Sequence, residues 1–88
     1  EVVYFYQYND ASFETKAKQA VFSKLLVQLK EEKGYEILLI PIAGDNDISA
    51  VNLLLDQYDI KQLPTILIDR KDKITEIQTA EELSKYFR

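Results

Sequence analysis

Residues 58–69 read Tyr-Asp-Ile-Lys-Gln-Leu-Pro-Thr-Ile-Leu-Ile-Asp, the segment most informative about the architecture. From Thr65 to Asp69 the chain is rich in aliphatic and β-branched side chains, which is typical of a buried strand. Pro64 stands directly before this run. A proline cannot continue a helix, and it forces the preceding residue toward extended backbone. The segment therefore predicts a helix that ends near Asp59, a tight turn at Pro64 and a strand over 65–69.

The chain after this strand predicts a hairpin and a final helix. Residues 70–73 are polar, and residues 74–78 alternate apolar with polar side chains, so a solvated turn and an antiparallel strand should follow. Thr79 and Glu82 have the spacing of a capping box, in which each side chain bonds the main chain of the other residue. The apolar face of the resulting helix would carry Leu83, Tyr86 and Phe87.

The chain before this segment predicts a second helix. Asp45, Asn46 and Asp47 carry side chains that cap helix N-termini. A helix of roughly three turns should follow, because apolar residues then recur at helical spacing. Its apolar face would be formed by Ile48, Val51, Leu54, Leu55 and Tyr58.

A calcium loop is the competing interpretation of this acidic segment. Positions 1, 3, 5 and 12 of the loop template would be filled by Asp45, Asp47, Ser49 and Asp56. Ala50 stands where the loop needs glycine for a sharp turn, and the apolar residues after it favour a helix. We therefore expect helix capping and no metal site.

Two further strands are predicted in the first half of the chain. Residues 2–8 are β-branched, aromatic and uncharged, which indicates a strand buried on both faces at the centre of a sheet. Residues 35–42 are also strand-like but include Pro41, which has no N–H to donate. This second strand should therefore lie at an edge of the sheet.

A long helix should join these two strands. Asn9, Asp10 and Ser12 supply capping side chains, and helical spacing continues to Gly34, giving about twenty residues. Its apolar face would carry Phe13, Ala17, Ala20, Val21, Leu25 and Leu29.

Together these elements predict an α/β domain of order βαβαββα over residues 1–88. The first two strands should pair in parallel across a crossover helix, in a four-stranded mixed sheet with helices on both faces. Because the 88-residue chain begins at Glu1 and contains no methionine, we expect that it was excised or processed from a longer one.

Composition excludes most kinds of chemistry and partner. The chain has no cysteine and no histidine, which removes thiol redox chemistry, imidazole catalysis and most zinc or copper sites. With two glycines and no flavin or nicotinamide motif, we expect no cofactor. The formal charge of −4 argues against nucleic acid and against an anionic membrane surface. We expect a soluble domain that is not an enzyme.

The element order, together with the segment from Tyr58 to Thr65, resembles the thioredoxin fold in its minimal, glutaredoxin-sized form. The resemblance implies that Pro64 is cis. It also implies that the family's Cys-x-x-Cys would begin at the first helix, with Asn9 and Ser12 in place of the cysteines and Tyr8 as the aromatic residue before them. Val3 stands where the family often keeps a buried acid. The glycine pair that helps glutaredoxins hold glutathione is absent from residues 73–79.

The resemblance therefore implies a redox-inactive domain that binds a protein or an extended peptide. The main chain of Leu63, before Pro64, would pair with the peptide, and Tyr8 and Leu63 would flank the groove; Asn9 and Ser12 complete the predicted site. The simpler alternative is that Tyr8 and Leu63 only complete local packing, and that Ser12 only caps the helix or is an exposed polar residue. A second hypothesis is a structural domain of a larger, membrane-anchored or soluble protein, with no ligand of its own. The strand edge over 36–42 offers another pairing surface, limited by Pro41.

Overall fold

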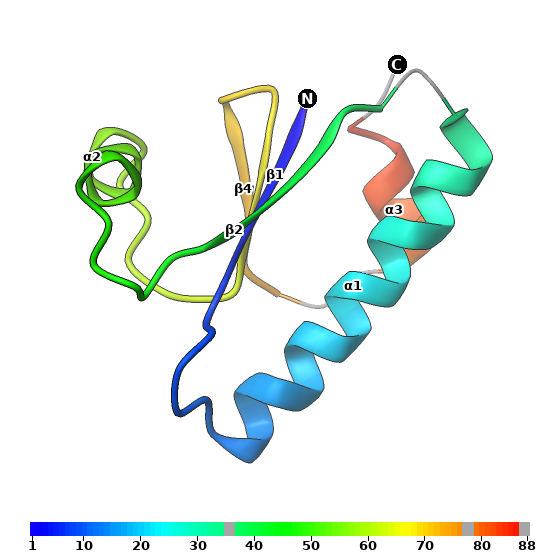
Figure 1. Ribbon diagram of the computed structural model, residues 1–88. Coiled ribbons are helices and arrows are strands. Elements are labelled where there is room, and N and C mark those ends of the chain that lie inside the picture. Colours follow the sequence, from blue (N-terminus) through cyan, green and yellow to red (C-terminus); the bar gives the residue numbers. More distant parts are fainter. Residues whose placement is uncertain (35–36, 77–78, 87–88) are drawn as a thin grey trace.

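The computed structural model describes residues 1–34, 37–76 and 79–86. Its elements follow the order βαβαββα, which confirms the predicted order. They are β1 (Val2–Tyr6), α1 (Phe13–Lys33), β2 (Leu39–Ala43), α2 (Ser49–Gln57), β3 (Thr65–Ile68), β4 (Asp72–Ile74) and α3 (Ala80–Ser84). Figure 1 shows α2 on one side of the sheet and α1 with α3 on the other.

The sheet has four strands in the order β2-β1-β3-β4 and is mixed, as predicted. β1 pairs in parallel with β2 and antiparallel with β3, and β3 and β4 form the predicted antiparallel hairpin. Each strand differs from the prediction in its boundaries: β2 covers Leu39–Ala43 in place of 35–42, and β3 ends at Ile68, one residue before the predicted end. β1 ends at Tyr6 and not at residue 8. β4 covers Asp72–Ile74, so it begins before the strand predicted over 74–78 and overlaps it only at Ile74. Residues 35, 36, 77 and 78 of the predicted strands lie outside the described residues.

Pro41 lies on the edge strand β2, at a position where its missing N–H costs nothing. Val2 N–H donates to the Leu38 carbonyl at 2.8 Å, and Gly44 N–H donates to the Tyr6 carbonyl at 2.9 Å. In a parallel ladder, the main-chain groups of successive residues point alternately toward the partner strand and away from it. Since Leu38 and Gly44 bond β1, the main-chain groups of Pro41 point to the outer side of the sheet. The predicted edge position is confirmed, with this physical reason.

The face of the sheet under α1 and α3 holds the larger hydrophobic core. Phe22, Leu26 and Leu29 of α1 are at most 4% exposed, and Leu83 of α3 is 1% exposed. They pack on the strand residues Val2, Tyr4, Ile66, Ile68 and Ile74. The rings of Tyr4 and Phe22 meet edge to face, with their centroids 6.4 Å apart.

α1 turns a different face to the sheet from the one predicted. It begins after the N-cap Ser12 and ends at Gly34, as expected. Of the six residues expected on its apolar face, Leu29 is buried and Leu25 is partly buried, but the other four are exposed: Phe13, Ala17, Ala20 and Val21. The prediction was wrong because α1 carries apolar side chains on several sides, so helical spacing alone did not select the buried one.

The opposite face is covered more loosely by α2. Val3, Phe5 and Leu67 of the sheet are buried there, and Leu54, Leu55 and Tyr58 pack against them while only partly buried. No residue of α2 is itself buried. Ile48, expected on the packed face, is 51% exposed. Leu54, Leu55 and Tyr58 of the predicted apolar face are turned to the sheet, whereas Val51 is partly buried and is not among the side chains packed on this cluster.

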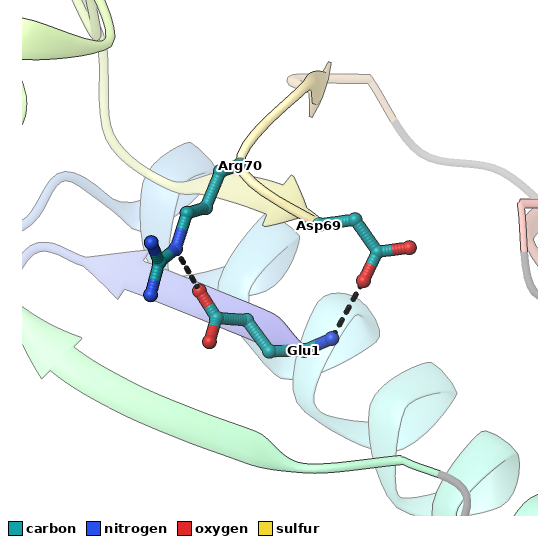
Figure 2. Close-up of polar contacts among 3 residues, drawn as sticks. All are labelled: Glu1, Asp69 and Arg70. Atoms are coloured by element: carbon teal, nitrogen blue, oxygen red, sulfur yellow. Dashed lines mark hydrogen bonds and ion pairs between the residues drawn. The ribbon is translucent and has the colours of Figure 1, made fainter.

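The turn between β3 and β4 is held by Glu1. Asp69 and Arg70 both have positive φ, at 51° and 59°, which suits the tight turn of a hairpin. Figure 2 shows Glu1 between them: its amino group is 2.6 Å from Asp69 Oδ1, and its carboxylate accepts from Arg70 Nε at 2.8 Å. The polar turn predicted over 70–73 lies one to two residues earlier, over 69–71, because β4 already begins at Asp72.

The last helix, α3, starts with the predicted capping box. Glu82 N–H donates to Thr79 Oγ1 at 3.1 Å, and Thr79 N–H donates to Glu82 Oε1 at 3.2 Å. Leu83 is buried as expected, Tyr86 is 36% exposed, and Phe87 lies outside the described residues. Among the helices of the described ranges, none combines the length and the apolar character that a membrane crossing requires.

Candidate functional site

Two loops meet at the end of the sheet where β1 and β2 finish. The carboxylate of Asp45, which follows β2, accepts from Tyr8 N–H at 2.8 Å and from Asn9 N–H at 2.7 Å. Asn9 Nδ2 donates to Asn46 Oδ1 at 2.8 Å. These bonds hold the pKa of Asp45 below its ordinary value, chiefly because the Tyr8 N–H stabilises the charged form. The β1–α1 and β2–α2 loops are thereby tied together.

This geometry corrects the predicted role of the acidic segment. The N-cap of α2 is Ile48, which offers no side-chain capping bond. Asp45 bonds the other loop instead, and Asp47 accepts from Asn52 Nδ2 at 2.9 Å. The helix-capping prediction was wrong because a partner distant in the sequence competes for the Asp45 carboxylate. Within the described ranges, no group of three acidic side chains is placed to hold a metal ion.

Tyr8, Asn9 and Ser12 lie along the β1–α1 loop. The Tyr8 side chain is 69% exposed. Ser12 is the N-cap of α1, where its Oγ accepts from Thr15 N–H at 3.1 Å. The hydroxyl is therefore occupied in capping, which confirms the predicted capping role of Ser12. Asn9 is likewise engaged with Asp45 and Asn46. Tyr8 is the predicted site residue on this loop whose side chain bonds no described residue.

Leu63 and Pro64 lie beside these loops, before β3. The peptide bond between them is cis. Pro64 is fully buried, and Leu63 packs partly buried against the α2 face of the sheet. A Cβ placed on Gly44 would come within 3.0 Å of Leu63 Cδ2. The side chain of Leu63 is therefore directed into packing, and only its main chain is left for a ligand.

The main chain of Leu63 has no hydrogen-bond partner among the described residues. The β1–β3 register pairs Phe5 with Thr65, so its continuation would set Leu63 opposite Gln7. Gln7 bonds elsewhere: its N–H donates to Gln19 Oε1 at 2.6 Å, and its carbonyl accepts from Gln19 Nε2 at 3.2 Å. Gln19 thus takes up both groups that would otherwise close the ladder.

Two residues of this arrangement were missed by the sequence analysis. The sequence assigned no role to Gln19, and it predicted Asp45 as a helix cap. Each acts on main-chain groups at least 12 residues away. A single sequence carries no local signal for such contacts, since neither spacing nor composition marks them.

Chemically, the assembled site offers main-chain groups and one exposed aromatic ring. The aliphatic hydroxyl of Ser12 caps a helix, and the chain has no histidine to activate it. The arrangement is suited to holding extended backbone. Comparisons with protein-family models, with curated proteins and with solved structures each found no match.

Proposed function

We propose that this chain is a redox-inactive, thioredoxin-like domain that binds an extended protein segment or peptide through the loop ending at Pro64. The observation that carries the proposal is the unpartnered main chain of Leu63. Extended peptides bind such groups as an added strand, with main-chain hydrogen bonds supplying the affinity. The domain has no enzymatic role in this proposal and takes no cofactor.

The five predicted residues divide into contacts and supports. Leu63 supplies the N–H and C=O that pair with the peptide, and Tyr8 supplies an exposed ring for a peptide side chain. Asn9 and Ser12 fix the shape of the β1–α1 loop through bonds to Asn46 and Thr15. Pro64, fully buried, positions Leu63. The peptide would lie where Gln7 leaves the β1–β3 ladder.

The redox-inactive part of the proposal is tested by dithiol-driven insulin reduction. Thiol–disulfide exchange needs a nucleophilic thiolate, and the chain contains no cysteine. The expected rate equals that of the blank without protein. A rate that rises in proportion to the protein concentration would contradict the proposal.

The binding part is tested by selecting a library of short random peptides against the immobilised domain. Enriched peptides should shift the NMR amide signals of Tyr8 and Leu63 on titration. Methylating the peptide nitrogen that faces Leu63 should abolish binding, because it removes a main-chain donor while leaving the side chains unchanged.

Tyr8→Ala and Phe13→Ala form a matched pair for this experiment. Both residues are exposed aromatics near the start of α1, at 69% and 86%, so neither change should unfold the domain. Peptide affinity should fall for Tyr8→Ala and stay unchanged for Phe13→Ala. A library that yields no enriched peptide would favour the second candidate, a structural domain without a ligand of its own, and would remove the first.

A further inference from the structure

A concave surface lies on the α1 side of the sheet, between α1 and the edge strand β2. It is an open groove of about 480 Å³. Its apolar walls are Tyr4, Tyr6, Leu26, Val27, Leu39 and Pro41. Sites for small molecules have volumes of roughly 300–1,000 Å³ and are lined mainly by apolar and aromatic groups with a few polar ones. The groove has this size and this character.

The polar groups of the groove differ in how far they are already engaged. Gln19 is occupied by Gln7, and Tyr4 donates its hydroxyl to the Gln19 carbonyl at 3.3 Å. Lys16 is the one charged side chain among the described lining residues, and it forms no ion pair with any described residue. No acidic side chain of the described residues lines the groove. Its charge complement is therefore a single negative group.

We propose that this groove binds a small amphipathic carboxylate, with the carboxylate at Lys16 and an apolar body along Tyr6, Val27 and Leu39. The negative group pairs with the free ammonium, and the body removes the exposed apolar lining from water. This site is separate from the Leu63 loop, and its existence does not depend on the peptide proposal.

Strand pairing is the less suitable use of the same surface. An extended chain added to β2 would meet Pro41, whose position on the outer side of the edge has no N–H to offer. The ladder would be interrupted at its centre. A small ligand needs no such ladder, and it fills the groove above Pro41 through apolar contact.

The experiment is an NMR titration of the whole chain with decanoate, below the concentration at which decanoate forms micelles. Saturable shifts are expected at the amides of Ala20, Val27 and Leu39, which line the groove. Decanol, with the same chain and no charge, should bind more weakly. Equal affinities for decanoate and decanol would overturn the proposal, as would shifts centred on α2 or the absence of saturation.

Two matched pairs of variants locate the ligand. Lys16→Gln should weaken decanoate binding roughly two- to five-fold, as expected for one solvent-exposed ion pair, and leave decanol unaffected. Lys24→Gln, the same charge change on α1 outside the groove lining, should leave both affinities unchanged. If the two lysine variants weaken decanoate equally, the effect is one of net charge and the proposed contact at Lys16 is wrong.

Val27→Glu should abolish saturable decanoate binding, because it places a like charge on the groove wall. Val27 is 54% exposed, so the helix tolerates the change. Val21→Glu is the control with equal net charge, on the same helix and outside the groove lining. Decanoate binding that survives Val27→Glu would show that the groove is not the site.

Discussion

The two faces of the sheet are covered in different ways. Under α1 and α3, helix and strand side chains are buried together, and Phe22, Leu29 and Leu83 are each 1% exposed. Under α2, the sheet residues Val3 and Phe5 are buried, but every residue of α2 keeps some contact with solvent. The helices α1 and α3 therefore contribute buried side chains to the core, whereas α2 packs on the sheet without a buried residue of its own.

The difference indicates where stability is concentrated and where the chain can adapt. Burial of apolar surface supplies most of the free energy of folding, so the α1 face should account for the larger share. The proposed peptide site is connected to the α2 side. Its β1–α1 loop is bonded to Asp45, in the loop before α2, and Leu63, in the loop after α2, packs on the α2 face of the sheet. Adaptable regions are usually those with few buried apolar contacts.

Phe22→Ala should produce the largest effect. Removing a fully buried aromatic side chain leaves a cavity and costs about 3–5 kcal/mol. Small domains have only about 5–15 kcal/mol of stability, so much of the folded population should be lost on mild denaturation. Urea unfolding followed by circular dichroism gives the value. A cost below about 1 kcal/mol would mean that the α1 face is not the main core.

Leu54→Ala should cost less, because the side chain on α2 is only partly buried. We expect a loss of roughly 1–2 kcal/mol, about half the usual range for a fully buried leucine. The same urea experiment applies. Leu53→Ala is the matched control, since Leu53 is 67% exposed on the same helix and should change stability little. Equal costs for Phe22→Ala and Leu54→Ala would remove the difference between the faces.

Asp45→Asn should loosen the loops on the α2 side without affecting the α1 core. The pKa of Asp45 is lowered in the folded protein, so its contribution to stability is fully present above the ordinary carboxyl value of 3.8. It is lost as the pH falls below that value through the lowered one. The wild type should therefore lose more stability in acid than Asp45→Asn does, as thermal melts at several pH values would measure.

Asp56→Asn serves as the control for this titration, because Asp56 is exposed on α2 and makes no bond to either loop among the described residues. Its acid dependence should match that of the wild type. An acid response that is identical in the wild type and in Asp45→Asn would show that the two main-chain bonds contribute nothing.

Gly44→Ala should produce the smallest change in stability. The added Cβ would lie 3.0 and 3.1 Å from the two methyl carbons of Leu63, which end a flexible side chain and can turn aside. The cost of this movement and the gain from a less flexible unfolded chain, about 0.4–1 kcal/mol, should roughly cancel. The NMR signal of the Leu63 amide should nevertheless shift. A large loss of stability would show that Leu63 cannot move.

Sequence reasoning predicted the features that depend on neighbours in the chain. The capping box at Thr79, the helix end at Gly34 and the edge position of Pro41 each follow from local chemistry. The features it missed depend on contacts across the fold. The face that α1 turns to the sheet depends on which of its side chains pack there. The Asp45 carboxylate bonds the main chain of Asn9, which is 36 residues away.

At the candidate site, too, local chemistry could be predicted and contacts across the fold could not. The capping role of Ser12 could be predicted from its position before an apolar helix. The resemblance already implied that the main chain of Leu63 is available, but the physical cause could not be predicted, because Gln19 draws Gln7 away from the ladder. A side-chain amide that replaces a strand partner leaves no recognisable pattern in the sequence.

The outward position of Pro41 also bears on how copies of this chain behave when crowded together. An uncovered strand at the end of a sheet is a template on which another chain can stack, and repeated stacking leads to fibres. On β2, Pro41 interrupts the row of outward-facing N–H groups, while the hydrogen bonds between β2 and β1 remain intact. Pro41 therefore hinders self-assembly at this edge without removing a hydrogen bond between β1 and β2. Light scattering from concentrated Pro41→Val should rise with time, whereas that of the wild type should stay constant.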